Sequence, residues 1–178
     1  KDSGARHLFI DRTKLTELGD SFMADLDRIV LDEQLDDWMA DADTRAPNHH
    51  PQPDDPFNII YSSGTTGTPK GILHDYRFRQ RQMVRMSRFG LDGDAVNLVS
   101  TPLYSNTTLV SVLPTLFHGG TLVIMAKFDA RRFLELAEAH RVTHAMLVPV
   151  QYQRILADTE FERFDLSSFK LKLCTSAP

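Results

Sequence analysis

Apolar and polar residues follow one another along the first part of the chain in a pattern that predicts alternating strands and helices. Residues 7–11 and 28–31 are short apolar runs of strand length. Between them, apolar residues recur at spacings of three and four, at Leu15, Leu18, Phe22 and Leu26. This spacing predicts an amphipathic helix. Residues 1–42 are therefore expected to hold a β-α-β unit, with a further short helix over 33–42.

The alternation continues after residue 57. Strand-length apolar runs lie at residues 57–60, 71–74, 96–99, 121–125, 144–148 and 170–175. Helical patterns lie between them, at residues 76–89, 107–117, 129–140 and 151–157. The run at 121–125 is apolar throughout, which is typical of a strand covered on both faces. Strands that alternate with helices predict an α/β fold with a mainly parallel sheet and flanking helices.

Residues 43–56 interrupt this pattern. The segment holds four prolines, and each proline removes a backbone donor and restricts the residue before it. Regular structure is not expected there. The chain is accordingly interpreted as a first part over 1–42, a linker over 43–56 and a core over 57–178.

Composition narrows the class of protein. Of the 178 residues, 42% are hydrophobic and 25% are charged, and the net charge is −4. These values are ordinary for a globular protein and give no reason to expect a nucleic-acid partner. Cys174 is the only cysteine, so no internal disulfide can form. No apolar run reaches the length of a membrane span, and a cytoplasmic protein without a transmembrane segment is the expectation.

The stretch Tyr61–Gly71, with the sequence YSSGTTGTPKG, carries the clearest chemical signal. Its glycines let backbone N–H groups approach a bulky anion, its serine and threonine hydroxyls add donors, and Lys70 adds a positive charge. The rival interpretation is a flexible Ser/Gly surface loop. A Pro-Lys-Gly end followed directly by another apolar run favours a phosphate-binding loop.

A Walker A loop does not fit these residues. That motif needs a glycine before its lysine and a hydroxyl after it, and it opens a helix. Pro69 and Gly71 occupy those two positions, and the residues that follow have the pattern of a strand. The sequence therefore predicts a glycine-loop hairpin, with one strand on each side of the loop.

The string SSGTTGTPKG, preceded by Asp55-Pro56 and an apolar strand, resembles the phosphate loop of the adenylate-forming (AMP-binding) superfamily. That superfamily includes acyl-CoA synthetases such as long-chain fatty acid–CoA ligases, peptide-synthetase adenylation domains and beetle luciferases. The resemblance extends over residues 55–178. The further segments that carry it are Pro102-Leu103-Tyr104, Phe117-His118-Gly119-Gly120, Thr143-His144, Val148-Pro149 and Lys172–Pro178.

The resemblance implies an ATP-dependent, AMP-forming acid–thiol ligase. In that reaction a fatty or aromatic carboxylic acid attacks the α-phosphorus of ATP, with Mg²⁺ as the bridging ion, and the acyl adenylate then passes its acyl group to CoA. The resemblance places the phosphates of ATP on Ser62, Ser63, Gly64, Thr65, Thr66, Gly67 and Lys70. It assigns no catalytic or metal-ligating residue within this chain.

Two segments are expected beside the acyl substrate. The family pattern has an aromatic residue and a histidine after the proline, and this chain has Tyr104 and Ser105 at those positions. The same run of residues is also typical of a helix N-cap. A second segment aligns with a Gly-Ala-Pro-type turn near the nucleotide. The resemblance therefore implies a substrate pocket lined by Tyr104, Ser105, Asn106, Ser176, Ala177 and Pro178.

The resemblance places the Mg²⁺-binding acid, the ribose-binding aspartate and a C-terminal lysine after Pro178. The chain is accordingly interpreted as an internal fragment of a large N-terminal domain that is inactive by itself. A peptide-synthetase adenylation domain is one alternative, which the lack of acids between Asp94 and Asp129 disfavours. The other alternative is a truncated, non-catalytic nucleotide-binding or scaffold protein.

The helix expected over 76–89 is unusually basic, with arginines at positions 77, 79, 81, 85 and 88. A solvated face is the first interpretation of these arginines, and a docking surface for the phosphates of CoA is the second. Three histidines near the expected elements are interpreted as structural. His74 follows the hairpin, His118 ends a helix and His144 begins a strand.

Overall fold

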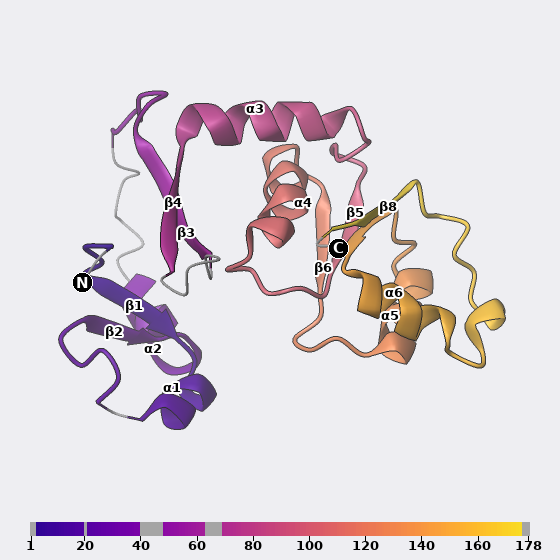
Figure 1. Ribbon diagram of the computed structural model, residues 1–178, viewed down its shortest axis with the longest axis horizontal. Coiled ribbons are helices and arrows are strands. Elements are labelled where there is room, and N and C mark those ends of the chain that lie inside the picture. Colours follow the sequence, from indigo (N-terminus) through magenta and orange to yellow (C-terminus); the bar gives the residue numbers. More distant parts are fainter. Residues whose placement is uncertain (1–2, 20, 40–47, 63–68, 176–178) are drawn as a thin grey trace. The chain divides into compact units, whose positions relative to one another are not determined.

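A computed structural model of the protein describes residues 3–19, 21–39, 48–62 and 69–175 (Figure 1). The chain forms two compact units, Lys1–Pro51 and Gln52–Pro178. The division between them lies within the proline-containing segment 43–56.

The first unit holds two parallel strands and two helices. Its elements are β1 (His7–Ile10), α1 (Arg12–Leu18), β2 (Asp27–Val30) and α2 (Leu31–Met39). The parallel pairing of β1 with β2 is the one that a β-α-β connection produces. Ile10, Leu15 and Val30 form a small buried core between these elements.

Helix α1 is shorter than the apolar spacing predicts. The side chain of Asp11 caps its first turn by accepting a hydrogen bond from the Lys14 N–H. The helix ends before Gly19, whose φ of 84° lies in a region that glycine adopts at little cost. Phe22 and Leu26 follow in turns, so the prediction of a helix as far as Leu26 was wrong. Helix α2 begins two residues before the predicted start at 33.

The second unit begins with an antiparallel hairpin and a long helix. Strand β3 (Pro56–Ser62) pairs with β4 (Lys70–Asp75), and α3 (Tyr76–Ser87) follows directly. Asp75 caps α3 by accepting a hydrogen bond from the Phe78 N–H at 2.6 Å. Both strands of the predicted hairpin are confirmed, and α3 ends two residues before the predicted 89.

A four-stranded parallel sheet forms the rest of this unit, in the order β6-β5-β7-β8. The α/β fold with flanking helices is thereby confirmed. Its elements are β5 (Val96–Val99), α4 (Asn106–Phe117), β6 (Thr121–Ile124), α5 (Ala130–Ala139), β7 (His144–Leu147), α6 (Pro149–Leu156), the 3-10 helix η1 (Phe161–Arg163) and β8 (Leu171–Cys174).

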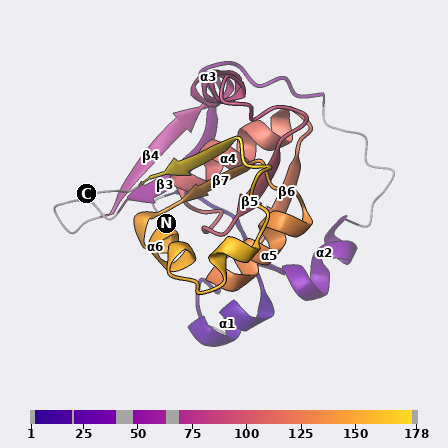
Figure 2. The ribbon, with the colours of Figure 1, turned by 90° about the vertical axis from the view of Figure 1, so that its right-hand side faces the viewer.

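The helices cover both faces of this sheet (Figure 2). Successive side chains of a strand point to opposite faces. On β5, Leu98 packs into the core with Phe133 of α5 and Ile155 of α6, whereas Asn97 donates a hydrogen bond to Thr115 of α4. The sheet thus has α5 and α6 on one face and α4 on the other.

Strand β6 differs from its prediction as a fully covered strand. Among the described strands it has one neighbour, β5, and Ile124 is 59% exposed. A run of apolar residues does not reveal whether its strand lies inside a sheet or at an edge, because that depends on which strands pair with it.

Candidate functional site

The β3–β4 hairpin brings the two described ends of the glycine-rich stretch together. Ser62 and Lys70 are register partners at the loop end of β3 and β4, and both are exposed. Partners in an antiparallel pair project on the same face. The predicted phosphate ligands between them lie outside the described residues, and these are Ser63, Gly64, Thr65, Thr66 and Gly67.

The residues after the loop exclude a Walker A arrangement. Lys70 begins a strand that pairs antiparallel with the strand before the loop, whereas a Walker A lysine lies where a helix starts. Gly71, the next residue of this strand, leaves room for side chains of the partner strand. A Cβ atom on Gly71 would lie 3.1 Å from Ile59 Cγ2 and 3.3 Å from the Tyr61 ring, so glycine lets these side chains pack across the hairpin.

A buried guanidinium connects the hairpin to α3. Arg79 is fully buried, so the expectation that all five arginines form a solvated face was wrong at this position. Its Nε donates to Asn58 Oδ1 at 3.0 Å, and its Nη1 donates to Gln82 Oε1 at 2.8 Å. Its Nη2 lies 3.3 Å from His74 Nδ1. These bonds join β3, β4 and α3 at one side chain.

The charge on Arg79 sets the state of His74. An arginine only donates hydrogen bonds, so Nδ1 of His74 accepts from Arg79 and carries no proton. Burial, and then the positive charge of Arg79, lower the pKa of His74. Burial also lowers the pKa of Arg79. The ring of His74 stacks on Phe78 at 4.7 Å, which places the histidine in the structural role that the sequence predicts.

A hollow of about 350 Å³ opens at the carboxyl ends of the parallel strands. In open α/β sheets this edge is the usual place for ligands. The hollow is bounded by the segments that follow β5, β6 and β7. Its lining residues are Ser100, Thr101, Pro102, Ser105, Thr107, Phe128, Val148, Val150, Gln151 and Arg154.

Gln151 holds two of these segments together. It is 7% exposed, its Nε2 donates to Ser100 Oγ at 3.2 Å, and its Oε1 accepts from the Val148 N–H at 3.1 Å. The hydroxyl groups of Thr101 and Thr108 lie 2.7 Å apart, which ties the same β5–α4 connection to α4. The hollow therefore has walls that are fixed by hydrogen bonds.

The structure separates the predicted pocket residues. Ser105 lines the hollow at the N-cap position of α4, where its side chain makes no capping hydrogen bond. Tyr104 is 82% exposed and is not among the lining residues. In the described part of the chain, Asn106 Oδ1 is shielded from solvent and has no hydrogen-bond partner. Ser176, Ala177 and Pro178 lie outside the described residues.

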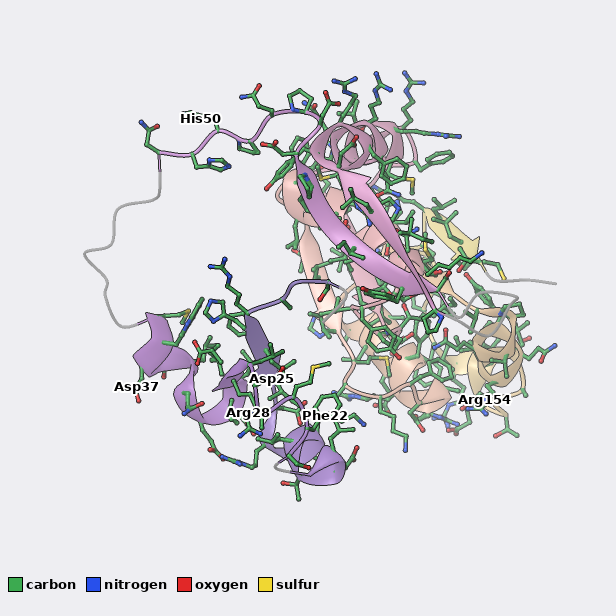
Figure 3. The ribbon with its side chains drawn as sticks, turned by 60° about the vertical axis from the view of Figure 1, so that its left-hand side comes forward. Phe22, Asp25, Arg28, Asp37, His50 and Arg154 are labelled. Carbon is green, nitrogen blue, oxygen red and sulfur yellow. The ribbon has the colours of Figure 1, made fainter. Side chains whose placement is uncertain are left out.

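Sequence reasoning missed Gln151 and Arg154. Both come from α6, and the long side chain of Arg154 projects from this helix (Figure 3). In the sequence, the Val148-Pro149 segment could have pointed to these two residues, because it marks the place where a strand ends and a helix begins. That signal does not indicate that the following helix turns Gln151 toward the β5–α4 connection.

The described residues include no group of three His, Cys, Asp or Glu side chains that could hold a metal ion. No metal-dependent step is assigned to these residues. No helix in the described ranges is long and apolar enough to cross a membrane.

Comparison with known proteins identifies relatives of this chain. Feruloyl-CoA synthase from an Amycolatopsis species is 37% identical over 127 residues, which cover 70% of this chain and 26% of that protein. The 4-coumarate–CoA ligase 1 of Solanum tuberosum is 35% identical over 141 residues, which cover 71% of this chain and 24% of that protein. The chain thus spans about a quarter of the length of these relatives.

Solved structures have the same fold. The inhibitor-bound N-terminal domain of FACL13 from Mycobacterium tuberculosis matches with a TM-score of 0.84 at 23% identity, over 99% of this chain and 46% of that one. ATP-bound MatB from Rhodopseudomonas palustris matches with a TM-score of 0.79 at 26% identity, over 97% of this chain and 35% of that one. A family model described as AMP-binding enzyme matches residues 1–178. The chain therefore belongs to the AMP-binding enzyme family.

Proposed function

We propose that the protein is an ATP-dependent, AMP-forming acyl-CoA synthetase that activates a carboxylic acid, with an aromatic acid ahead of a fatty acid. The relatives named for feruloyl-CoA and 4-coumarate–CoA support the aromatic class. ATP and CoA are the proposed co-substrates, and Mg²⁺ is the proposed metal. The expected cellular location is the cytoplasm.

The pairing of Ser62 with Lys70 carries this proposal. It places a hydroxyl and an ammonium group on one face at the loop end of the hairpin, where the glycine-rich residues connect the two strands. Positive charge and donors at that place stabilise negative charge on a departing pyrophosphate. Ser63, Gly64, Thr65, Thr66 and Gly67 are proposed as the further phosphate ligands.

The hollow at the carboxyl ends of β5, β6 and β7 is the proposed place of the acyl substrate. Ser105 lines it directly, and Tyr104 and Asn106 flank Ser105 in the chain. Val148, Val150 and Phe128 supply apolar lining that suits a hydrocarbon or aromatic body. Ser176, Ala177 and Pro178 remain proposed members of the pocket.

The test is acid-dependent release of pyrophosphate from ATP by the full-length protein, followed by thioester formation with CoA. The acids are ferulate, 4-coumarate, a long-chain fatty acid and a panel of amino acids. Lys70→Ala is expected to lower kcat about a hundredfold to a thousandfold, the usual loss when one stabilising group is removed from a developing anion. Lys170→Ala, a change of an exposed lysine outside the site, is the matched control.

Each outcome separates the candidates. Activity with an aromatic acid and CoA supports the proposal, and activity confined to amino acids supports a peptide-synthetase adenylation domain instead. If the full-length protein releases no pyrophosphate with any acid of the panel, the non-catalytic alternative remains. Equal activity of Lys70→Ala and the wild type would contradict the role of the hairpin.

A further inference from the structure

One positive charge lines the hollow at the carboxyl ends of β5, β6 and β7. Among the described residues that line it, Arg154 is the only charged one, and the others are apolar or carry hydroxyl or amide groups. Arg154 is exposed, and within the described part of the chain it belongs to no ion pair. A guanidinium stays charged at physiological pH and only donates hydrogen bonds. The hollow therefore offers a permanent positive charge to a ligand.

The acidic residues that flank the hollow along the chain are engaged elsewhere. Asp129, at the start of α5, accepts a hydrogen bond from the Arg132 N–H at 2.8 Å. Asp158, which follows α6, pairs with Arg131 at 2.7 Å. The first turn of α4, at the edge of the hollow, contains no acidic residue, so the positive end of this helix adds to the charge of Arg154. The sign of the hollow therefore favours an anionic group of the ligand.

Helix α6 presents Gln151 and Arg154 to the hollow at two levels. Residues three apart lie on the same side of a helix, about 4.5 Å from each other along its axis. Gln151 lies near the strand ends, where it bonds to Ser100 and to the Val148 N–H. Val148 and Val150 supply apolar lining at this same level. A ligand in the hollow thus has its apolar body beside the start of α6 and its anionic group near Arg154, further along the helix.

The charge of Arg154 suits a group that keeps its own charge during the proposed reaction. When the substrate carboxylate attacks the α-phosphorus of ATP, its oxygen forms the new bond to phosphorus and loses its negative charge, and pyrophosphate leaves. A guanidinium paired with this carboxylate would stabilise the substrate more than the transition state and would slow the step. A second acidic group on the substrate is unchanged by the reaction, so its pairing with Arg154 stabilises both states equally.

We propose that Arg154 selects aryl acids that carry a second carboxylate at the end opposite the reacting one. The guanidinium binds this second carboxylate through paired hydrogen bonds. The apolar lining of the hollow, with Phe128 beside the two valines, holds the ring. This inference rests on the proposed ligase function and narrows the substrate class of its acyl site to dicarboxylic aryl acids.

The test compares cinnamate with 4-carboxycinnamate, which differ only in the second carboxylate, in acid-dependent pyrophosphate release by the full-length protein. The wild type is expected to have a kcat/KM about tenfold or more higher for 4-carboxycinnamate. Arg154→Met is expected to raise the KM for this acid about tenfold to a hundredfold and to leave kcat unchanged, because the lost pairing stabilises substrate and transition state equally. The kinetics of cinnamate are expected to stay the same in the two proteins.

Two further variants sharpen the comparison. Arg85→Met removes an exposed arginine of α3 that does not line the hollow, and it is expected to leave the kinetics of both acids unchanged. Arg154→Lys keeps the charge without the paired donors, and it is expected to restore part of the preference for 4-carboxycinnamate.

Calorimetric binding of the two acids in the absence of ATP tests Arg154 separately from the ligase reaction. Tighter binding of 4-carboxycinnamate than of cinnamate by the wild type, lost in Arg154→Met, would support the proposal even if no acid released pyrophosphate, a result that would contradict the ligase function alone. Equal affinity of the wild type for the two acids, an equal loss of both acids in Arg154→Met, or a loss of the same size in Arg85→Met would each overturn the proposal.

Discussion

Arg79 is the residue that shows most clearly how side-chain contacts support the proposed phosphate loop. A buried charge is costly unless hydrogen bonds satisfy it. In the described part of the chain, Arg79 has bonds to Asn58, Gln82 and His74 but no carboxylate partner. Its ring contact with Phe78, at 5.5 Å, adds a cation–π interaction. The hairpin that ends in Ser62 and Lys70 is thus fixed to α3 by polar contacts.

The titration of His74 provides a test of this arrangement. Its folded pKa lies below the ordinary value of 6.5 because of burial and Arg79. Between the folded pKa and about 6.5, the unfolded chain therefore binds more protons at this residue than the folded chain. The contribution of His74 to stability is fully present above pH 6.5 and is lost as the pH falls through that window.

We expect Arg79→Met to raise the pKa of His74 toward its ordinary value, because the neighbouring positive charge is removed. NMR titration of the His74 ring measures this shift. Arg81→Met, which changes an exposed arginine two positions away, is expected to leave the pKa of His74 where it was. A His74 pKa that is the same in Arg79→Met and the wild type would show that the contact at 3.3 Å does not matter in solution.

A hydrogen bond from Tyr152 joins helix α6 to strand β8. The Tyr152 hydroxyl donates to the Leu173 carbonyl at 2.9 Å. Burial, and then Cys174, raise the pKa of Tyr152 to about 12. Helix α6 also supplies Gln151 and Arg154 to the hollow. The bond from Tyr152 therefore helps to position the helix that forms one wall of the proposed acyl site.

We expect Tyr152→Phe to lower the free energy of unfolding by about 1 kcal/mol, the usual net value of one internal hydrogen bond. Urea denaturation measures the change. Tyr104→Phe removes the same hydroxyl from a side chain that is 82% exposed, and its unfolding midpoint is expected to match the wild type. Equal effects of the two substitutions would be evidence against the α6–β8 hydrogen bond.

The whole chain divides into two compact units with the boundary at Pro51 and Gln52. Residues 48–54 around this boundary are exposed and form no helix or strand. Such segments are preferred sites of proteolysis, whereas packed elements resist it. The proposed phosphate loop and acyl hollow belong to the second unit.

We expect brief digestion with a protease of broad specificity to cut in or next to the segment 43–56, with a stable product that begins near Gln52. Mass spectrometry of the products locates the cuts. Matched digestion in urea, where all segments are accessible, is the control. Early cleavage inside the parallel sheet, at β5 or β7 for example, would contradict the division into these two units.

Much of the fold could be predicted from the sequence because local rules decided it. The strand beside Tyr61, the turn from Asp75 into α3 and the cap at Asp129 all depend on residues within a few positions of one another. The helix predicted through Leu26 was wrong for a reason that is also local. Gly19 permits the backbone conformation that ends α1, and the apolar spacing beyond it continued by coincidence.

The sequence by itself determined the order of the elements and the hairpin, since spacing, glycine and proline act over short distances along the chain. Only the tertiary structure decided that Arg79 is buried, that β6 has one neighbour among the described strands, and that Gln151 and Ser105 line one hollow. These features depend on which segments distant in sequence pack together. Burial and strand pairing arise from those long-range contacts, and no local pattern contains them.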